Sequence, residues 1–180
     1  MSRQNLLIYN LFPRLTGNFS QWISHVERAK KLNFNAIFIN PFHYPGFSGS
    51  LYAVKDYYEV NPMFLSVPKD EKNGLEQLKD FVQEVKKMDM LLIMDLVINH
   101  SARDSLIAEQ HPEWFKKDEH GEFISPGAWD DQLGERVVWG DLIEVDNDFS
   151  SDKHGLWNYW LDLVNFYGEL GFDGFRCDAA

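Results

Sequence analysis

The chain alternates short apolar runs with segments whose apolar residues recur at helical spacing. The apolar runs predict four strands, at residues 6–9, 36–39, 90–98 and 172–178. Helical spacing predicts three helices, over residues 19–32, 75–88 and 156–170. Asn18 or Ser20 is placed to cap the first helix, and Gly171 is placed to end the last. The third run is almost continuously apolar, as is typical of a parallel strand that is buried on both faces.

The order of these elements predicts the fold class. Residues 101–149 are polar, contain several prolines and glycines, and are too long for an ordinary loop, so they predict an inserted subdomain. Successive strand–helix units form a parallel sheet, and four of them make half of a (β/α)₈ barrel. We therefore expect an α/β fold, a partial TIM barrel whose segments are 1–100, 101–149 (the insertion after the third strand) and 150–180. A doubly wound sheet is the alternative, but the first turn lacks a glycine fingerprint for phosphate binding.

Composition and charge argue against some classes of binding partner. The net charge is -11, and no cluster of Lys or Arg is longer than two residues, which argues against nucleic acids and anionic membranes as partners. No apolar run is long enough to span a membrane, and the N-terminal run is too short for a secretory signal. Cys177 is the only cysteine, so a reducing compartment is permitted. We expect a cytoplasmic protein.

Two charged stretches end the third and fourth strands, where barrel enzymes place their catalytic groups. Arg176 and Asp178 are two residues apart on a strand, so their side chains point to the same side. A guanidinium beside a carboxylate favours the ionised, nucleophilic form, although a structural ion pair is the alternative. Asp95 places a charge at the end of an apolar run and needs a partner, for which Arg176 on the neighbouring strand is the candidate.

Asn99 and His100 follow the third strand and are placed to reach a ligand or a metal. A metal-dependent barrel hydrolase that uses His100 and His111 is a separate hypothesis. The spacings of these histidines and the nearby acids fit no compact metal-binding motif.

Three stretches together carry a family resemblance. DLVINH (Asp95–His100) closely resembles the first signature of the α-amylase family, glycoside hydrolase family 13, and GFRCDAA (Gly174–Ala180) resembles its second. GSLYAVKDYYEVNP (Gly49–Pro62) is similar to a tyrosine-containing stretch that follows the family's second strand, with Leu51 as an extra residue. The insertion is similar to the family's domain B. The resemblance covers essentially the whole chain.

The resemblance implies a role for each matched residue. Asp178 would be the nucleophile that forms a covalent glycosyl–enzyme intermediate, and Arg176 would hold it ionised and aligned. His100 would hydrogen-bond the sugar next to the cleaved bond, and Tyr52 would stack on that sugar. Asp95 would support Arg176 through a hydrogen bond.

The resemblance implies no required cofactor, but it does imply a calcium site. Asn99 matches a position that binds Ca²⁺ in many members, and Asp141 matches an acidic residue that often ligates the same ion. Oxygen donors suit Ca²⁺, which takes six to eight of them. Many intracellular members lack this ion, so Ca²⁺ is an optional ligand here.

Aromatic residues in the insertion have two interpretations. HPEWF (His111–Phe115) resembles a stretch in members that act on maltose or transfer maltosyl units. Large aromatic side chains serve either as sugar platforms or as core. For four of them we expect core: Trp114, Phe115, Trp129 and Trp139.

A retaining glycosidase needs two carboxylates about 5–5.5 Å apart. In the family the acid/base Glu ends the fifth strand, and the sequence stops at Ala180, before that position. We therefore expect the nucleophile half of an α-glucan-active retaining hydrolase or transglycosylase, truncated and inactive alone. Its partners would be an α-linked oligosaccharide or glucan and either the rest of the barrel or a second copy. A non-catalytic fragment that binds glucan or a partner chain is the alternative.

Overall fold

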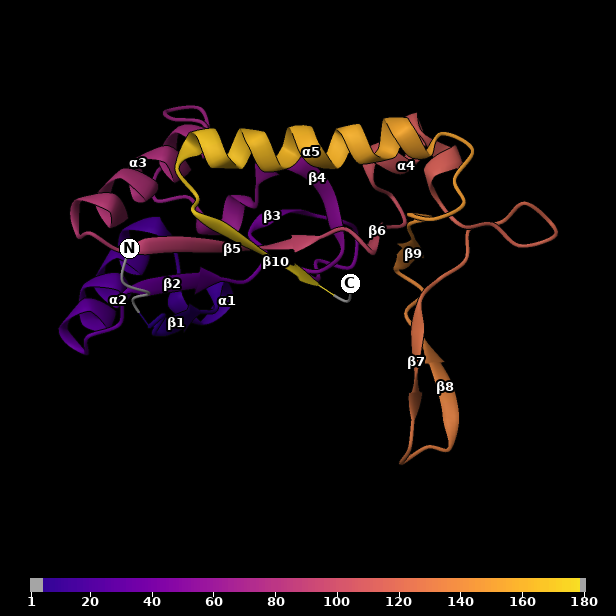
Figure 1. Cartoon of the computed structure of the whole chain (residues 1–180), viewed down its shortest axis with the longest axis horizontal. Coiled ribbons are helices and arrows are strands. Elements are labelled where there is room, and N and C mark those ends of the chain that lie inside the picture. Colours follow the sequence, from indigo (N-terminus) through magenta and orange to yellow (C-terminus); the bar gives the residue numbers. More distant parts are fainter. Residues whose placement is uncertain (1–4, 179–180) are drawn as a thin grey trace. The chain divides into compact units, whose positions relative to one another are not determined.

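The computed structural model describes residues 5–178. Residues 1–4 and 179–180, which belong to the expected segments 1–100 and 150–180, lie outside the described residues. The elements up to the insertion are β1 (Ile8–Leu11), α1 (Pro13–Thr16), α2 (Phe19–Lys31), β2 (Ala36–Ile39), β3 (His43–Pro45), β4 (Val54–Val60), η1 (Pro62–Phe64), α3 (Gly74–Lys87) and β5 (Leu91–Val97). They are followed by β6 (His100–Ala102), α4 (Leu106–Gln110), η2 (Pro112–Trp114), β7 (Gly127–Asp130), β8 (Glu135–Val138), β9 (Leu142–Glu144), α5 (Lys153–Leu170) and β10 (Gly174–Asp178) (Figure 1).

The four predicted strands and three predicted helices are confirmed. The first strand is displaced and covers Ile8–Leu11, not residues 6–9; α5 begins earlier than predicted, at Lys153, and β10 later, at Gly174. Asn18 caps α2, where its side chain accepts a hydrogen bond from the amide of Gln21, as the N-cap rule predicts. Gly171 ends α5 with a φ of 112°, a left-handed value that glycine adopts without steric cost.

The chain divides into two compact units. The first contains Met1–Phe42, Tyr58–Leu96 and Val164–Cys177. Its centre is a four-stranded sheet in the order β1-β2-β5-β10. The pairs β1–β2 and β2–β5 are parallel, with Leu11 opposite Ile39 and Ile39 opposite Met94. A parallel sheet with helices between its strands confirms the α/β fold class.

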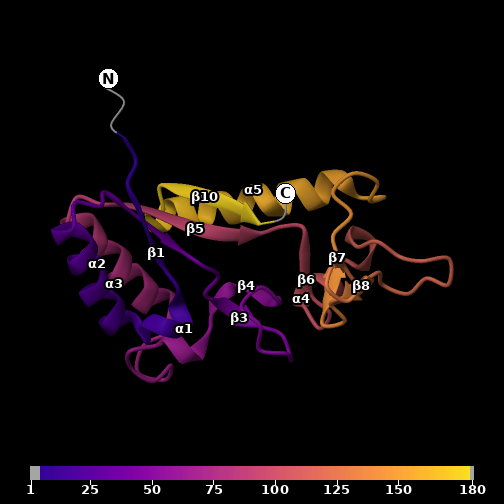
Figure 2. The ribbon, with the colours of Figure 1, turned by 90° about the horizontal axis from the view of Figure 1, so that it is seen from below.

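Helices α2 and α3 pack against each other in the first unit and lie side by side (Figure 2). The ring of Phe81 stacks on that of Phe19, with ring centroids 5.9 Å apart, and forms a T-shaped contact with Trp22, with ring centroids 5.4 Å apart. All three side chains are buried, and the Trp22 indole donates a hydrogen bond to the carbonyl of Gly17 at 2.7 Å. This aromatic cluster fixes the two helices beside the sheet that carries the charged strand ends.

The second unit contains His43–Tyr57, Val97–Leu163 and Asp178–Ala180. The stretch after β2, for which the sequence pattern predicted no strand, forms the paired strands β3 and β4, closed by a hydrogen bond from Gly46 N to Ala53 O at 2.8 Å. Strand β4 escaped prediction because its buried residues recur at every third position, which fits no strand template. The Tyr57 hydroxyl donates to the carbonyl of Val97 at 2.8 Å and ties β4 to the end of β5.

The insertion is built from short elements. Strand β6 pairs antiparallel with β9, and β7 with β8. Trp114 and Phe115 are buried, which confirms them as core. Trp129 and Trp139 are 65% and 44% exposed, so the expectation that they belong to the core is wrong. Both lie in or directly after the hairpin β7–β8, a two-stranded ribbon too thin to bury large rings.

The helices of residues 5–178 give no membrane span, because none combines the required length with sufficient apolar character. The longest helix, α5, has 18 residues, and Asn, Asp, Lys, His and Glu side chains occur along it.

Candidate active site

The seven residues predicted for the site fall into two groups. Asp95 and Arg176 belong to the first unit, where they form an ion pair. The remaining predicted residues line one pocket of the second unit: Tyr52, Asn99, His100, Asp141 and Asp178. Strand β10 carries both Arg176 and Asp178.

Asp95 and Arg176 form the pair that the sequence predicted. One guanidinium nitrogen, Nη1 of Arg176, donates to both carboxylate oxygens of Asp95, at 3.0 and 3.1 Å. The Asp95 side chain is fully buried, whereas the Arg176 side chain is 48% exposed. A buried carboxylate needs such charge-assisted bonds, because burial without them would be costly. Strands β5 and β10 are neighbours in the sheet, which brings the two side chains together.

Asp178 is the last residue of β10 and comes two positions after Arg176. Alternation along a strand therefore places the two side chains on the same face. Asp178 is half-buried. Within β10, Arg176 bonds to Asp95, and Asp178 lines the pocket.

The pocket has a volume of about 610 Å³, enough for a small ligand. It is lined by Ser50, Tyr52, Asn99, His100, Trp139, Asp141, Leu142 and Asp178. Two carboxylates, one imidazole and two aromatic rings therefore converge on one space. Flat apolar rings beside hydrogen-bonding groups suit a sugar, which has an apolar ring face and a polar rim.

His100 begins β6 and is 5% exposed. Burial lowers the pKa of His100, while Asp178, a hydrogen bond with the backbone of Tyr52, and Asp141 oppose that shift. Its Nε2 atom is buried and has no hydrogen-bond partner in the part of the chain that the structure describes. A buried ring nitrogen without a partner is uncommon in folded proteins and calls for an explanation.

Asn99 and Asp141, the predicted calcium ligands, line the same pocket. They offer two oxygen-bearing side chains, and Ca²⁺ takes six to eight oxygen ligands. Among residues 5–178 no group of three or more His, Cys, Asp or Glu side chains gathers in a way that could hold a metal ion. Calcium binding stays a prediction.

Trp139, for which core was favoured over a sugar platform, lines the pocket. The signal for this role was its place two residues before the site candidate Asp141. HPEWF does not reach the pocket: Trp114 is buried against His111, with ring centroids 3.8 Å apart, and donates to Asp152 at 3.1 Å.

A model of the glucanotransferase domain of glycogen debranching enzyme matches residues 1–134. The chain belongs to the α-amylase family. Among α-amylase family structures, a noncanonic maltogenic α-amylase from Thermotoga neapolitana is 29% identical, with a TM-score of 0.77 over 100% of this chain and 40% of that one. An α-amylase from Lactobacillus plantarum is 27% identical, with a TM-score of 0.77 over 97% of this chain and 38% of that one.

Curated relatives also match. An α-1,4-glucan:maltose-1-phosphate maltosyltransferase from Picrophilus torridus is 27% identical over 59% of this chain and 19% of its own length. The chain spans about a third of the length of several other curated relatives. It is therefore related to α-glucan hydrolases and transglycosylases over part of their catalytic domain.

Proposed function

We propose that residues 1–180 are the nucleophile-bearing part of a (β/α)₈ barrel that acts on α-linked glucan with retention of configuration. The observation that carries this proposal is the single pocket lined by Asp178, His100 and Tyr52. The strand order β1-β2-β5-β10 follows the chain without reversal, as in a barrel, whereas a doubly wound sheet reverses its order at a switch point.

In this proposal Asp178 attacks the anomeric carbon of a glucosyl unit. A carbon–oxygen bond to the carboxylate forms while the bond to the leaving group breaks, which gives the covalent intermediate of a retaining enzyme. Arg176 acts on Asp178 through β10, because its bonds to the buried Asp95 hold the strand two residues before the nucleophile.

The other pocket residues bind the sugar. Because burial lowers the pKa of His100, its imidazole is neutral at neutral pH, and its buried Nε2 can exchange a hydrogen bond with a sugar hydroxyl. The ring of Tyr52 is half-buried and offers a face for stacking. These contacts would fix the anomeric carbon near Asp178.

Turnover of a glucan also requires a second carboxyl group that protonates the leaving oxygen. In the family resemblance this acid/base Glu matches no acidic residue in residues 1–180, so we propose that it lies in the rest of the barrel. The chain of 180 residues should accordingly bind glucan without cleaving it.

An α-glucosyl fluoride isolates the nucleophilic step, because fluoride departs without protonation. Asp178 would form a bond to the anomeric carbon as the carbon–fluorine bond breaks and fluoride is released. Intact-mass spectrometry of the chain should then show the added mass of one glucosyl residue. Asp178→Asn should abolish the adduct, and Asp131→Asn, at an exposed position of the insertion, should not.

The alternative is a fragment that binds glucan without chemistry. Maltooligosaccharide binding with no adduct in the wild-type chain would support that alternative. An adduct that persists in Asp178→Asn would refute the assignment of the nucleophile.

Transfer to a second sugar is favoured over hydrolysis by one observation, the match of residues 1–134 to a glucanotransferase domain. The whole protein, given maltotriose, should then form longer oligosaccharides as its main products. Release of glucose and maltose alone would favour hydrolysis.

A further inference from the structure

One wall of the pocket is a tight turn that joins β8 to β9. Trp139, Asp141 and Leu142 belong to this turn, and all three line the pocket. The amide of Leu142 donates to the carbonyl of Trp139 at 3.0 Å and closes the turn. The Trp139 side chain is 44% exposed, so packing against a core does not fix its ring. Its position depends on the backbone that carries it.

That backbone is held by Arg103, which directly follows β6 and does not line the pocket. The amide of Arg103 donates to the carbonyl of Asp141 at 2.8 Å, and its Nε donates to the carbonyl of Gly140 at 3.1 Å. Two consecutive carbonyls of the turn are thus bound by one residue. Gly140 has no side chain that could restrain the turn, and the Trp139 amide donates to the carbonyl of Pro126 at 2.9 Å, so the two Arg103 bonds act together with this backbone bond.

The other end of the Arg103 side chain is also anchored. Its Nη2 donates to the hydroxyl of Ser125 at 2.9 Å and to the carbonyl of Phe123 at 3.4 Å. The Ser125 hydroxyl in turn donates to the carbonyl of Leu142 at 2.8 Å. Arg103 and Ser125 together therefore bond to the turn at Gly140, Asp141 and Leu142. A planar guanidinium with several donors can make such a bridge, whereas a lysine ammonium has no second arm.

We propose that Arg103 is a positioning residue for glucan binding, because it holds the Trp139 ring and the Asp141 carboxylate against the sugar. The ring of Trp139 supplies a flat apolar surface for a glucosyl unit, whereas the carboxylates and His100 of the same pocket supply polar groups. This inference rests on the proposed function, since it names the residue that shapes the sugar site. It assigns a binding role to an arginine that does not touch the ligand.

Maltoheptaose binding to the 180-residue chain tests the proposal. Arg103→Ala should weaken binding roughly tenfold, the loss expected when charge-assisted hydrogen bonds that order a site are removed. Arg103→Lys should recover only part of that loss, because one ammonium cannot bond Gly140 and Ser125 together. Trp139→Ala should weaken binding at least as much as Arg103→Ala. Arg136→Ala, at an exposed arginine of β8 in the same insertion, is the matched control and should bind like wild type.

A spectroscopic measurement separates positioning from folding. The indole N–H signal of Trp139 in a two-dimensional NMR spectrum, assigned from Trp139→Phe, should shift or broaden in Arg103→Ala, while the indole signals of the buried Trp22 and Trp114 stay in place. If wild type binds maltoheptaose and Arg103→Ala binds it with the same affinity, this inference is overturned and the proposed function still stands. If wild type binds no maltoheptaose, the proposed function fails, and an unmoved Trp139 signal would then overturn the positioning role as well.

Discussion

Among single residues, the buried histidines show how burial sets a charge state. Burial lowers the pKa of His43 to about 3 and lowers that of His100. The unfolded chain therefore binds these protons more readily, so stability is lost as pH falls below about 6.5. From His43 alone we expect the free energy of unfolding to fall by about 2 kcal/mol between pH 7 and pH 5.

Urea denaturation at a series of pH values measures this loss. His43→Phe keeps a ring beside Tyr57, whose centroid lies 5.7 Å away, but cannot be protonated, so its stability should depend less on pH. His120→Gln, at an exposed position, is the control and should follow the wild-type curve. Equal pH slopes for wild type and His43→Phe would refute the assignment.

The ion pair of Asp95 and Arg176 also has a measurable cost of disruption. Arg176→Met removes two bonds from a fully buried carboxylate and should lower the free energy of unfolding by about 3 kcal/mol. The double variant Asp95→Asn/Arg176→Met should be more stable than Arg176→Met, because its buried group carries no charge. Arg28→Met, at an exposed position of α2, should change little. A double variant that is less stable than Arg176→Met would contradict this account.

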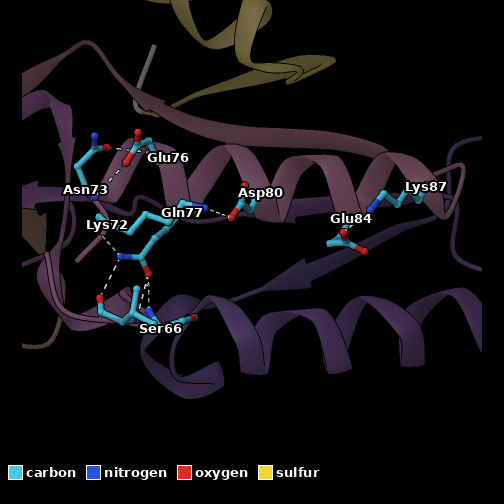
Figure 3. A network of polar contacts seen from close by, with 9 residues as sticks. Ser66, Lys72, Asn73, Glu76, Gln77, Asp80, Glu84 and Lys87 are labelled. Atoms are coloured by element: carbon cyan, nitrogen blue, oxygen red, sulfur yellow. Dashed lines mark hydrogen bonds and ion pairs between the residues drawn. The ribbon is translucent and has the colours of Figure 1, made fainter. Parts of the chain in front are cut away.

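At the scale of elements, the start of α3 depends on one buried amide. Gln77 is 5% exposed, and its Oε1 accepts from the amides of Ser66 and Val67 at 2.8 and 3.1 Å. Its Nε2 donates to the carbonyls of Val67 and Lys72 at 2.9 and 2.7 Å. The side chain thus fastens the loop before α3, next to the capping box of Asn73 and Glu76 (Figure 3).

Replacing this amide should loosen the loop and weaken the fold. We expect Gln77→Leu to lower the free energy of unfolding by about 3 kcal/mol, because the buried side chain loses four hydrogen bonds. Amide hydrogen exchange at Ser66 and Val67 should accelerate as well. Gln83→Leu, at an exposed position of the same helix, should do neither. Unchanged exchange at both amides in Gln77→Leu would show that the loop is held by other contacts.

Elements with a clear period were predictable from the sequence, and the others were not. α2 and α3 each present an apolar stripe and an Asn-x-x-Gln or Asn-x-x-Glu capping box, so local rules suffice. β5 is a continuous apolar run and was found for the same reason. β4 was missed because its buried positions follow neither period, and its pairing with β3 depends on a hairpin closed by Gly46.

The candidate site shows the same division at the scale of the whole molecule. The Asp95–Arg176 pair was predictable from the sequence, because neighbouring parallel strands bring residues at their ends together. Trp139 was wrongly assigned to the core, because whether a large ring is buried depends on what packs over the hairpin β7–β8. Arg103 was not singled out either, since its function is to bond backbone carbonyls that no sequence motif marks.

The four-stranded sheet leads to a prediction about assembly. Among the described residues, β1 and β10 each pair with one neighbour only, and edge strands of this kind tend to associate. Ile8 on β1 is 46% exposed and presents an apolar side chain at that edge.

Light scattering should therefore give the chain a mass above 21.0 kDa at high concentration. Ile8→Lys should lower this mass, because a charge at the edge opposes pairing. Leu15→Lys, at a leucine that is 84% exposed in α1, should not. A wild-type chain that stays monomeric at every concentration would show that both edges are protected.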